Sequence, residues 1–153
     1  MALQKVSFVR ASEADWKEVF RVELDLMSKT YASFRTEKEV RDSFKKSNVF
    51  LIKSDGELIG TTSYDTGEKG TAYLVSLGIL RKHQGQGFGR EALDWLLAEV
   101  VRTGHKKATL RVHPSNEKAK QMYERRGFKA VRPEENPYGD GEPRLFMEKD
   151  LTR

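Results

Sequence analysis

The sequence predicts a single α/β domain with a mixed sheet of about seven strands and four helices. β-type apolar runs alternate with amphipathic helical stretches along the chain, which is the order of a mixed α/β domain. The length of 153 residues suffices for one hydrophobic core without disulfides, and the chain has no cysteine. No repeat, linker or low-complexity segment divides it, so we expect residues 1–153 to form one domain.

The chain begins with one predicted strand and two predicted helices. Residues 4–10 alternate as a short strand. Ser12 opens a capping-box pattern, and apolar residues at helical spacing extend the first helix to about Lys29. Thr36 and Glu39 form a second capping box, which begins a shorter helix.

A three-strand meander is expected next. The β-rich runs 49–53 and 58–64 flank Asp55-Gly56, a pair that favours a tight hairpin because both central residues of that turn need a positive φ. A second turn-rich loop at 65–70 then leads antiparallel into a strand at 71–80.

Helices and strands alternate through the remainder of the chain. The expected elements are a helix ending before Gly104, a strand at 108–112, a helix at 117–126 between the N-cap Asn116 and Gly127, a strand at 128–131, an acidic loop at 133–143 and a strand at 145–151. The strands at 71–80 and 108–112 are joined through a helix and should therefore run parallel. Ligands of such sheets bind beyond the carboxyl ends of the strands.

Charge and hydropathy narrow the classes of function. The net charge is +5, but the 28 basic residues are interspersed with 23 acids, and no arginine-rich tail is present. We therefore do not expect nucleic acid as the primary ligand. No apolar run reaches the length of a membrane span, and the first residues lack the apolar core of a signal peptide. We expect a cytoplasmic protein without a membrane segment, and no residue pattern predicts a metal site.

The most informative stretch is 74–90, where a β-type run enters a glycine-rich bend and then a helix. This arrangement presents unpaired backbone N–H groups and the positive end of a helix dipole to an anion. Gly85, Gly87 and Gly89 are spaced G-x-G-x-G, which matches neither the dinucleotide fingerprint nor the P-loop. An ordinary strand-to-helix turn remains the alternative interpretation.

The pattern Gln84-x-x-Gly87-x-Gly89 resembles the coenzyme A pyrophosphate loop of the GNAT superfamily of N-acetyltransferases. A second stretch resembles the other signature of that superfamily: a strand followed by Asn116, then a short helix with Tyr123 that ends in Gly-Phe. The resemblance implies a mixed sheet whose central parallel strands splay apart to form an acyl-CoA cleft.

The resemblance also implies roles for individual residues, with acetyl-CoA as co-substrate. Tyr123 would protonate the departing thiolate, and Asn116 would bond the arm of the cofactor. The remaining cofactor-binding residues would be Leu77, Gly78 and Ile79 along the pantetheine arm, and Gln84, Gly85, Gln86, Gly87, Phe88, Gly89 and Arg90 around the pyrophosphate. From the residues alone, Tyr123 could instead be a packed aromatic and Asn116 a plain N-cap.

The expected reaction is direct attack of a primary amine on the thioester, and its general base is unassigned. Arg111 stands where some protein N-terminal acetyltransferases carry an acid, and His113 is a possible base whose alternative is a surface or capping role. A GNAT-like module that binds acyl-CoA for sensing or partner binding is the alternative function.

The acceptor is expected to be a small cationic amine or a peptide N-terminus. Acids of the 133–143 loop could attract a cation, although a solvated acidic loop explains them equally well. Tyr31, Glu134, Glu135 and Tyr138 are the predicted acceptor-binding residues. A homodimer is a further expectation.

Overall fold

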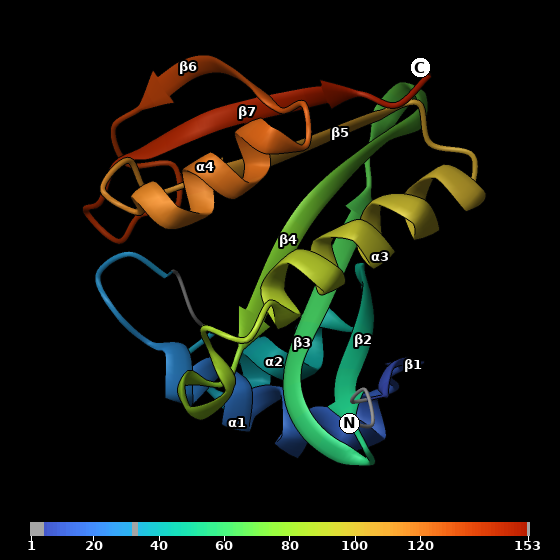
Figure 1. Cartoon of the computed structure of the whole chain (residues 1–153). Helices are drawn as coiled ribbons and strands as arrows, with labels where there is room; N and C mark the ends of the chain where they lie inside the picture. Colours follow the sequence, from blue (N-terminus) through green and yellow to red (C-terminus); the bar gives the residue numbers. More distant parts are fainter. Residues whose placement is uncertain (1–4, 32–33, 153) are drawn as a thin grey trace.

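The computed structural model describes residues 5–31 and 34–152. Residue 4 of the first predicted strand lies outside them. The elements in chain order are β1 (Val6–Arg10), α1 (Trp16–Leu26), α2 (Glu37–Ser43), β2 (Ser47–Ser54), β3 (Glu57–Thr66), β4 (Thr71–Ile79), α3 (Phe88–Arg102), β5 (Lys107–Val112), α4 (Glu117–Arg125), β6 (Lys129–Glu134) and β7 (Arg144–Asp150) (Figure 1). The predicted α/β class, with seven strands in one sheet and four α-helices in the described residues, is confirmed.

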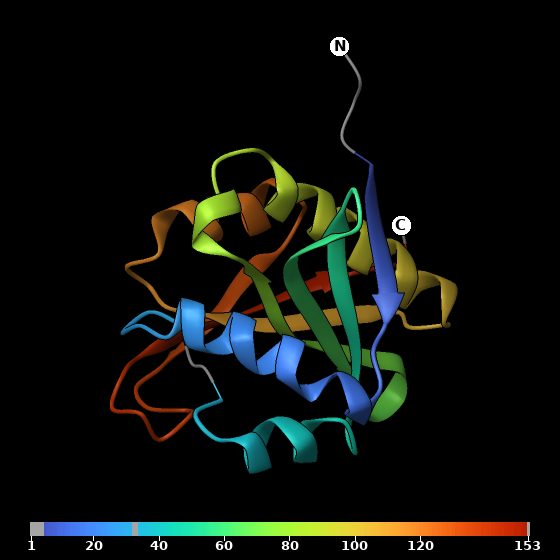
Figure 2. The ribbon, with the colours of Figure 1, turned by 90° about the horizontal axis from the view of Figure 1, so that it is seen from below.

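The sheet has the strand order β1-β2-β3-β4-β5-β7-β6, and its helices cover both faces. Helices α1 and α2 lie on one face, and α3 and α4 lie on the other (Figure 2). Each face has its own buried cluster, with Val22 and Leu26 of α1 in one and Leu93 and Leu96 of α3 in the other. The apolar stripes predicted from helical spacing therefore face the sheet from opposite sides.

The two central strands, β4 and β5, run parallel as predicted but stay together only briefly. Their pairing extends from Thr71 opposite Lys107 to Tyr73 opposite Thr109. The register with β3 shifts between Ser63 and Tyr64, which leaves Val75 as an extra residue in β4. Because a bulge bends its strand, β4 turns away from β5, and the two diverge (Figure 1). Among the described residues, one edge of β4 beyond Tyr73 is consequently without a strand partner.

Local turn chemistry follows the sequence closely. Asp55 and Gly56 have φ angles of 51° and 83°, so the predicted hairpin turn is confirmed. Gly104 and Gly127 end their helices with φ angles of 89° and 92°. The side chain of Thr36 accepts a hydrogen bond from the N–H of Glu39, as its capping box predicts.

Among the predicted boundaries, two differ most from the structure. The first α-helix ends at Leu26 rather than near Lys29, because Met27 already has an extended ψ of 120°. Strand β6 continues to Glu134, so Pro133 lies in a strand and not in the acidic loop. Since β6 is the edge strand of the sheet, the missing N–H of Pro133 need not cost a ladder hydrogen bond.

Candidate active site

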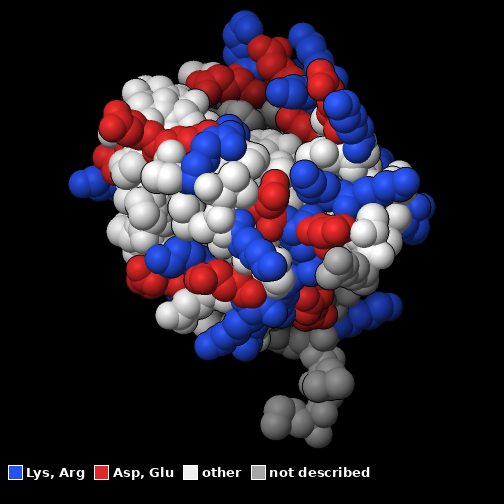
Figure 3. All heavy atoms as spheres, turned by 90° about the horizontal axis from the view of Figure 1, so that it is seen from above, with Lys and Arg blue, Asp and Glu red and all other residues white. Residues whose placement is uncertain are grey.

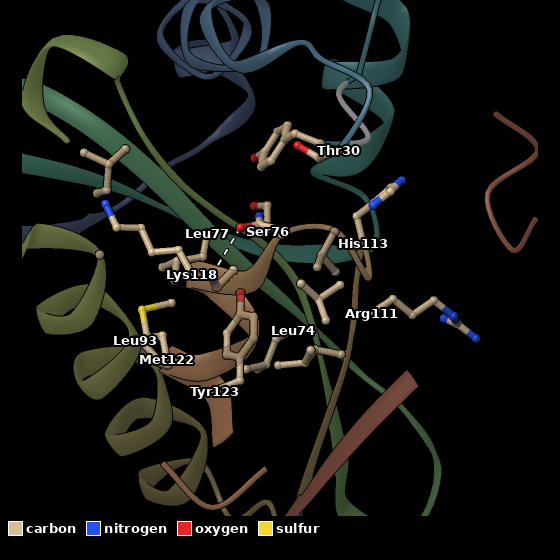
Figure 4. Close-up of a pocket in the computed structure, with 18 of the residues that line it drawn as sticks. Thr30, Leu74, Ser76, Leu77, Leu93, Arg111, His113, Lys118, Met122 and Tyr123 are labelled. Atoms are coloured by element: carbon tan, nitrogen blue, oxygen red, sulfur yellow. Dashed lines mark hydrogen bonds between the residues drawn. The ribbon is translucent and has the colours of Figure 1, made fainter. Parts of the chain in front are cut away.

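A cleft of about 1190 Å³ opens where β4 and β5 diverge. Its walls come from the segment after α1, from β4, the glycine loop, β5 and α4, and from residues 138–140 and 144 after β6. Figure 4 shows side chains of β4 and α4 meeting in this space. The cleft therefore lies at the carboxyl ends of the parallel strands, where the sequence predicts a ligand.

The glycine loop borders the cleft with unpaired main-chain donors. Gly85 and Gly87 have φ angles of 81° and 87°, which non-glycine residues rarely adopt. Gln84 fixes the start of the loop, because its Nε2 donates to the carbonyl of Ile79 at 2.9 Å. Within the described chain, no protein acceptor pairs with the backbone N–H groups from Gly85 to Arg90. They lie at the N-terminus of α3, whose dipole favours an anion there.

Gly89 shows that this loop leaves room for a ligand. A β-carbon placed on Gly89 would meet no atom within 4 Å, so packing within the described chain does not require a glycine there. Gly89 itself lines the cleft. We therefore expect a side chain at this position to take up open space beside the free N–H groups. These residues therefore fit a phosphate or pyrophosphate group.

Strand β4 forms the wall next to this loop. Leu77 and Ile79 line the cleft, and they lie beyond Tyr73, where the pairing of β4 with β5 ends. Gly78 has a different reason to be glycine: a β-carbon there would lie 2.5 Å from Cδ1 of Leu26 and 3.0 Å from the Tyr31 hydroxyl. Close approach of α1 and the following segment to β4 therefore requires this glycine.

Helix α4 contributes Asn116 and Tyr123. The Asn116 side chain accepts a hydrogen bond from the N–H of Ala119 at 3.2 Å, so its N-cap role is confirmed, while the residue also lines the cleft. The ring of Tyr123 packs edge-on against Phe128, with 5.8 Å between centroids. Its hydroxyl points toward β4 near Ser76 (Figure 4). Burial raises the pKa of Tyr123 to about 12, so the hydroxyl keeps its proton at neutral pH.

Basic side chains also line the cleft between the glycine loop and α4. Arg90, Lys118 and Arg125 are lining residues, and none of the three has an ion-pair partner among the described residues. Figure 4 shows Lys118 extending from the start of α4. A ligand with several negative charges suits this part of the cleft.

His113 lies at the end of β5 with both ring nitrogens engaged. Its Nδ1 accepts from the N–H of Ser115 at 3.1 Å, so the neutral ring carries its proton on Nε2. That nitrogen donates to Glu142 at 2.8 Å. Neither nitrogen has a lone pair left to accept a proton from an amine. The geometry thus gives His113 a bracing role between β5 and the 135–143 loop.

Arg111 points away from Tyr123 (Figure 4) and toward the end of β6. Its Nε donates to Glu134 at 2.5 Å, and Arg132 also donates to Glu134 at 3.2 Å. The guanidinium lies over the rings of Tyr73 and Phe146, at 5.4 and 5.1 Å from their centroids. The hydrogen bond to Glu134 raises the pKa of Arg111 above its ordinary value.

The predicted acceptor-binding residues fall into two groups. Tyr31 and Tyr138 line the cleft; the Tyr138 hydroxyl bonds to that of Tyr73, and Tyr138 is 41% exposed. Glu134 and Glu135 are not among the described lining residues, and Glu135 is exposed. Their predicted attraction of a cation stays a prediction.

Sequence reasoning missed Glu23, a lining residue that is only 2% exposed. Its carboxylate accepts the N–H of Phe34 at 3.2 Å. A signal was present in the sequence, because Glu23 lies on the apolar face that Val19, Val22 and Leu26 define in α1. An acid on the buried face of a helix needs a structural or functional reason.

The surface agrees with the mixed charge pattern. Figure 3 shows Lys and Arg interleaved with Asp and Glu over the face that it presents. Within residues 5–31 and 34–152, no helix is long and apolar enough to cross a membrane. The same residues hold no group of three or more acidic, histidine or cysteine side chains arranged for a metal ion.

Comparison with known proteins gives relatives in sequence and in structure. The 5-NmdU N-acetyltransferase of Pseudomonas phage PaMx11 is 29% identical over 89 residues, a match that covers 56% of this chain and 60% of that protein. The ribosomal-protein-S18-alanine N-acetyltransferase from Escherichia coli superposes with a TM-score of 0.83 at 22% identity, covering 97% of this chain and 96% of that one. A chimera of spermidine N-acetyltransferase SpeG from Vibrio cholerae and hSSAT gives a TM-score of 0.81 at 18% identity, with 96% of each chain covered.

The two structural likenesses show the fold, since both identities are low. The family rests on the sequence, because the model of the acetyltransferase (GNAT) family matches residues 13–128. That range includes the glycine loop, Asn116 and Tyr123. The chain belongs to the GNAT family of acetyltransferases.

Proposed function

We propose that this protein is an acetyl-CoA-dependent N-acetyltransferase that moves the acetyl group to a primary amine by direct attack on the thioester. One observation carries the proposal: the free N–H groups of Gly85–Arg90 and the unpaired edge of β4 border the same cleft. Main-chain donors at a helix N-terminus suit a pyrophosphate, and an open strand edge suits the amides of a pantetheine arm.

Acetyl-CoA supplies the thioester carbonyl, and the chain supplies binding, orientation and a proton. Gly85–Arg90 hold the pyrophosphate, and Leu77, Gly78 and Ile79 align the arm along β4. Asn116 offers its side-chain amide to the arm while capping α4. As the carbon–nitrogen bond forms and the carbon–sulfur bond breaks, Tyr123 donates its proton to the sulfur, and its pKa of about 12 keeps that proton available. The nitrogen gives up its proton to water, and water returns one to Tyr123.

The acceptor is a primary amine, on a small cation or at a peptide N-terminus. The names of the relatives favour this class, since they include a protein alanine and spermidine as acceptors. The sequence match to the 5-NmdU N-acetyltransferase adds a third acceptor to be tested. These relatives differ so much in acceptor that the fold alone does not select one.

Two measurements test the proposal. Acetyl-CoA should raise the melting temperature, since a ligand that binds only the folded state stabilises it. Release of free thiol should then depend on one member of a panel of polyamines, aminoglycosides, amino acids, short peptides and 5-NmdU. Stabilisation by acetyl-CoA without thiol release for any amine would favour the alternative, an acyl-CoA-binding module. Absence of both effects would reject the proposal.

A further inference from the structure

The hydroxyl of Tyr31 has an unmet hydrogen-bonding capacity inside the cleft. Its oxygen is buried and has no hydrogen-bond partner among the described residues. It lies against β4, 3.0 Å from the position that a β-carbon on Gly78 would take. Because a buried hydroxyl without a partner is costly, this group needs an explanation that the fold does not supply.

Glu23 lines the same cleft as Tyr31. It comes from the buried face of α1, and both residues line the cavity. Its carboxylate holds the N–H of Phe34, which ties α1 to the segment after Tyr31. After burial, the charge of Glu23 is the largest cause that raises the pKa of Tyr31 well above its ordinary value, followed by Tyr123. Glu23 and Tyr31 thus both face the cleft from the α1 side.

Tyr31 and Tyr123 approach the cleft from opposite faces of the sheet. Tyr31 follows α1, whereas Tyr123 belongs to α4, and the two helices cover different faces (Figure 2). Figure 4 shows Thr30, the neighbour of Tyr31, across the cleft from Tyr123. In the proposed reaction Tyr123 protonates the leaving sulfur. A group on the opposite side of the cleft can therefore bind the attacking nitrogen.

We propose that Tyr31 and Glu23 form the binding site for the acceptor amine. The Tyr31 oxygen accepts a hydrogen bond from the nitrogen, and the Glu23 carboxylate favours the cationic form in which a primary amine arrives. The inference rests on the proposed function and adds the ammonium group as the feature of the acceptor that the chain recognises.

Binding of two coenzyme A thioethers tests this assignment without a known acceptor. S-aminoethyl-coenzyme A places an ammonium group close to where the attacking nitrogen would lie, and S-propyl-coenzyme A has the same size without the charge. Calorimetry on the full chain should show that the wild type prefers the aminoethyl thioether by about tenfold or more.

Three variants separate recognition from folding. Glu23→Gln keeps an oxygen for the N–H of Phe34 but removes the charge, and it should reduce the preference to less than about twofold. Tyr31→Phe should reduce it by at least about threefold without lowering the melting temperature, because it removes only the unpartnered hydroxyl. Tyr64→Phe makes the same change in a buried residue that does not line the cleft, so the preference should stay at its wild-type value.

Equal affinity of the wild type for both thioethers, or a preference that survives both substitutions, would overturn the inference and leave the proposed function intact. Failure of both thioethers and of coenzyme A itself to bind would instead reject the proposed function. Should Glu23→Gln fail to fold, Tyr31→Phe decides the matter by itself.

Discussion

The two sides of the cleft are built in different ways. On the side of the glycine loop, the groups offered to a ligand are main-chain donors whose positions follow from glycine φ angles and a helix N-terminus. On the side of Tyr31 and Tyr138, the groups are side chains from segments far apart in the sequence, and many of them bond to one another. A main-chain site depends on local conformation, whereas a side-chain site depends on tertiary packing.

This difference bears on what each side can recognise. A main-chain cradle is set by backbone conformation and suits a ligand part that stays constant, such as a pyrophosphate. A side-chain wall can change by substitution, which suits an acceptor that differs between relatives as distinct as those matched here. We therefore expect substitutions on the two sides to affect different kinetic constants.

The largest effect is expected from Gly89→Val. Gly89 lines the cleft, and a β-carbon there would meet no atom of the described chain, so we expect the new side chain to occupy the space beside the free N–H groups and to hinder the pyrophosphate. Affinity for coenzyme A should fall by about 3 kcal/mol, or roughly 150-fold, the value of one or two charge-assisted hydrogen bonds. Calorimetry measures this loss directly.

Ala98→Val is the control, because it introduces the same side chain at an exposed position of α3 outside the cleft lining. It should leave coenzyme A affinity within about twofold. Unchanged affinity in a folded Gly89→Val protein would contradict the main-chain account of the cradle.

Tyr123→Phe should affect chemistry and not cofactor binding. It keeps the ring contact with Phe128 and removes the hydroxyl that is expected to protonate the sulfur. We expect kcat to fall by about 100-fold with little change in KM for acetyl-CoA. Since the pKa of Tyr123 is about 12, its hydroxyl should stay protonated below about pH 11. Deprotonation of Tyr123 should therefore not lower the wild-type rate below that pH.

Steady-state kinetics across pH, with the melting temperature as a folding check, measure both effects. If chemistry limits the rate and kcat changes by less than about twofold, Tyr123 is a packed aromatic only.

Glu134→Gln should affect stability more than catalysis. The hydrogen bond from Arg111 holds the pKa of Glu134 below its ordinary value of 4.5. A lowered pKa means that the stabilisation is fully present above the pKa of the unfolded chain and is lost as the pH falls through the folded value. The variant should lose about 1 kcal/mol of unfolding free energy at neutral pH, as expected for a partly exposed ion pair.

Denaturant titrations at several pH values measure this difference, which should shrink below about pH 4 as Glu134 takes up a proton. A difference that is constant from neutral pH to pH 3 would show that the charge of Glu134 is not what stabilises the end of β6.

The smallest effect is expected from Glu135→Gln. Glu135 is exposed and lies outside the described lining of the cleft, so water and salt screen its charge. The KM for the acceptor should change by less than about twofold at 150 mM salt. An increase of fivefold or more that disappears at high salt would instead support the attraction of a cationic acceptor by this residue.

The same contrast explains how much could be predicted from the sequence. The hairpin at Asp55-Gly56, the cap at Thr36 and the glycine loop are local, and each has the conformation that its residues indicate. The splay of β4 from β5 was available only through family resemblance, because the bulge at Val75 has no local signature.

The other side of the cleft depends on contacts between distant residues. Nothing in the sequence indicates that Arg111 pairs with Glu134, that His113 pairs with Glu142 or that Tyr138 meets Tyr73. Glu23 could have been predicted as a buried acid, since its place on the apolar face of a predicted helix is visible in the sequence. Its neighbour in the cleft, Tyr31, could be paired with it only after the fold had placed α1 against β4.

The most direct test of the main-chain account is amide NMR during a titration with coenzyme A. The backbone N–H groups from Gly85 to Arg90, which lack protein acceptors in the described chain, should show the largest shifts and should exchange with solvent more slowly in the complex. The amides of β6, on the far edge of the sheet, should stay unchanged. Saturation with coenzyme A while the amides of Gly85–Arg90 keep their free shifts and exchange rates would contradict the account.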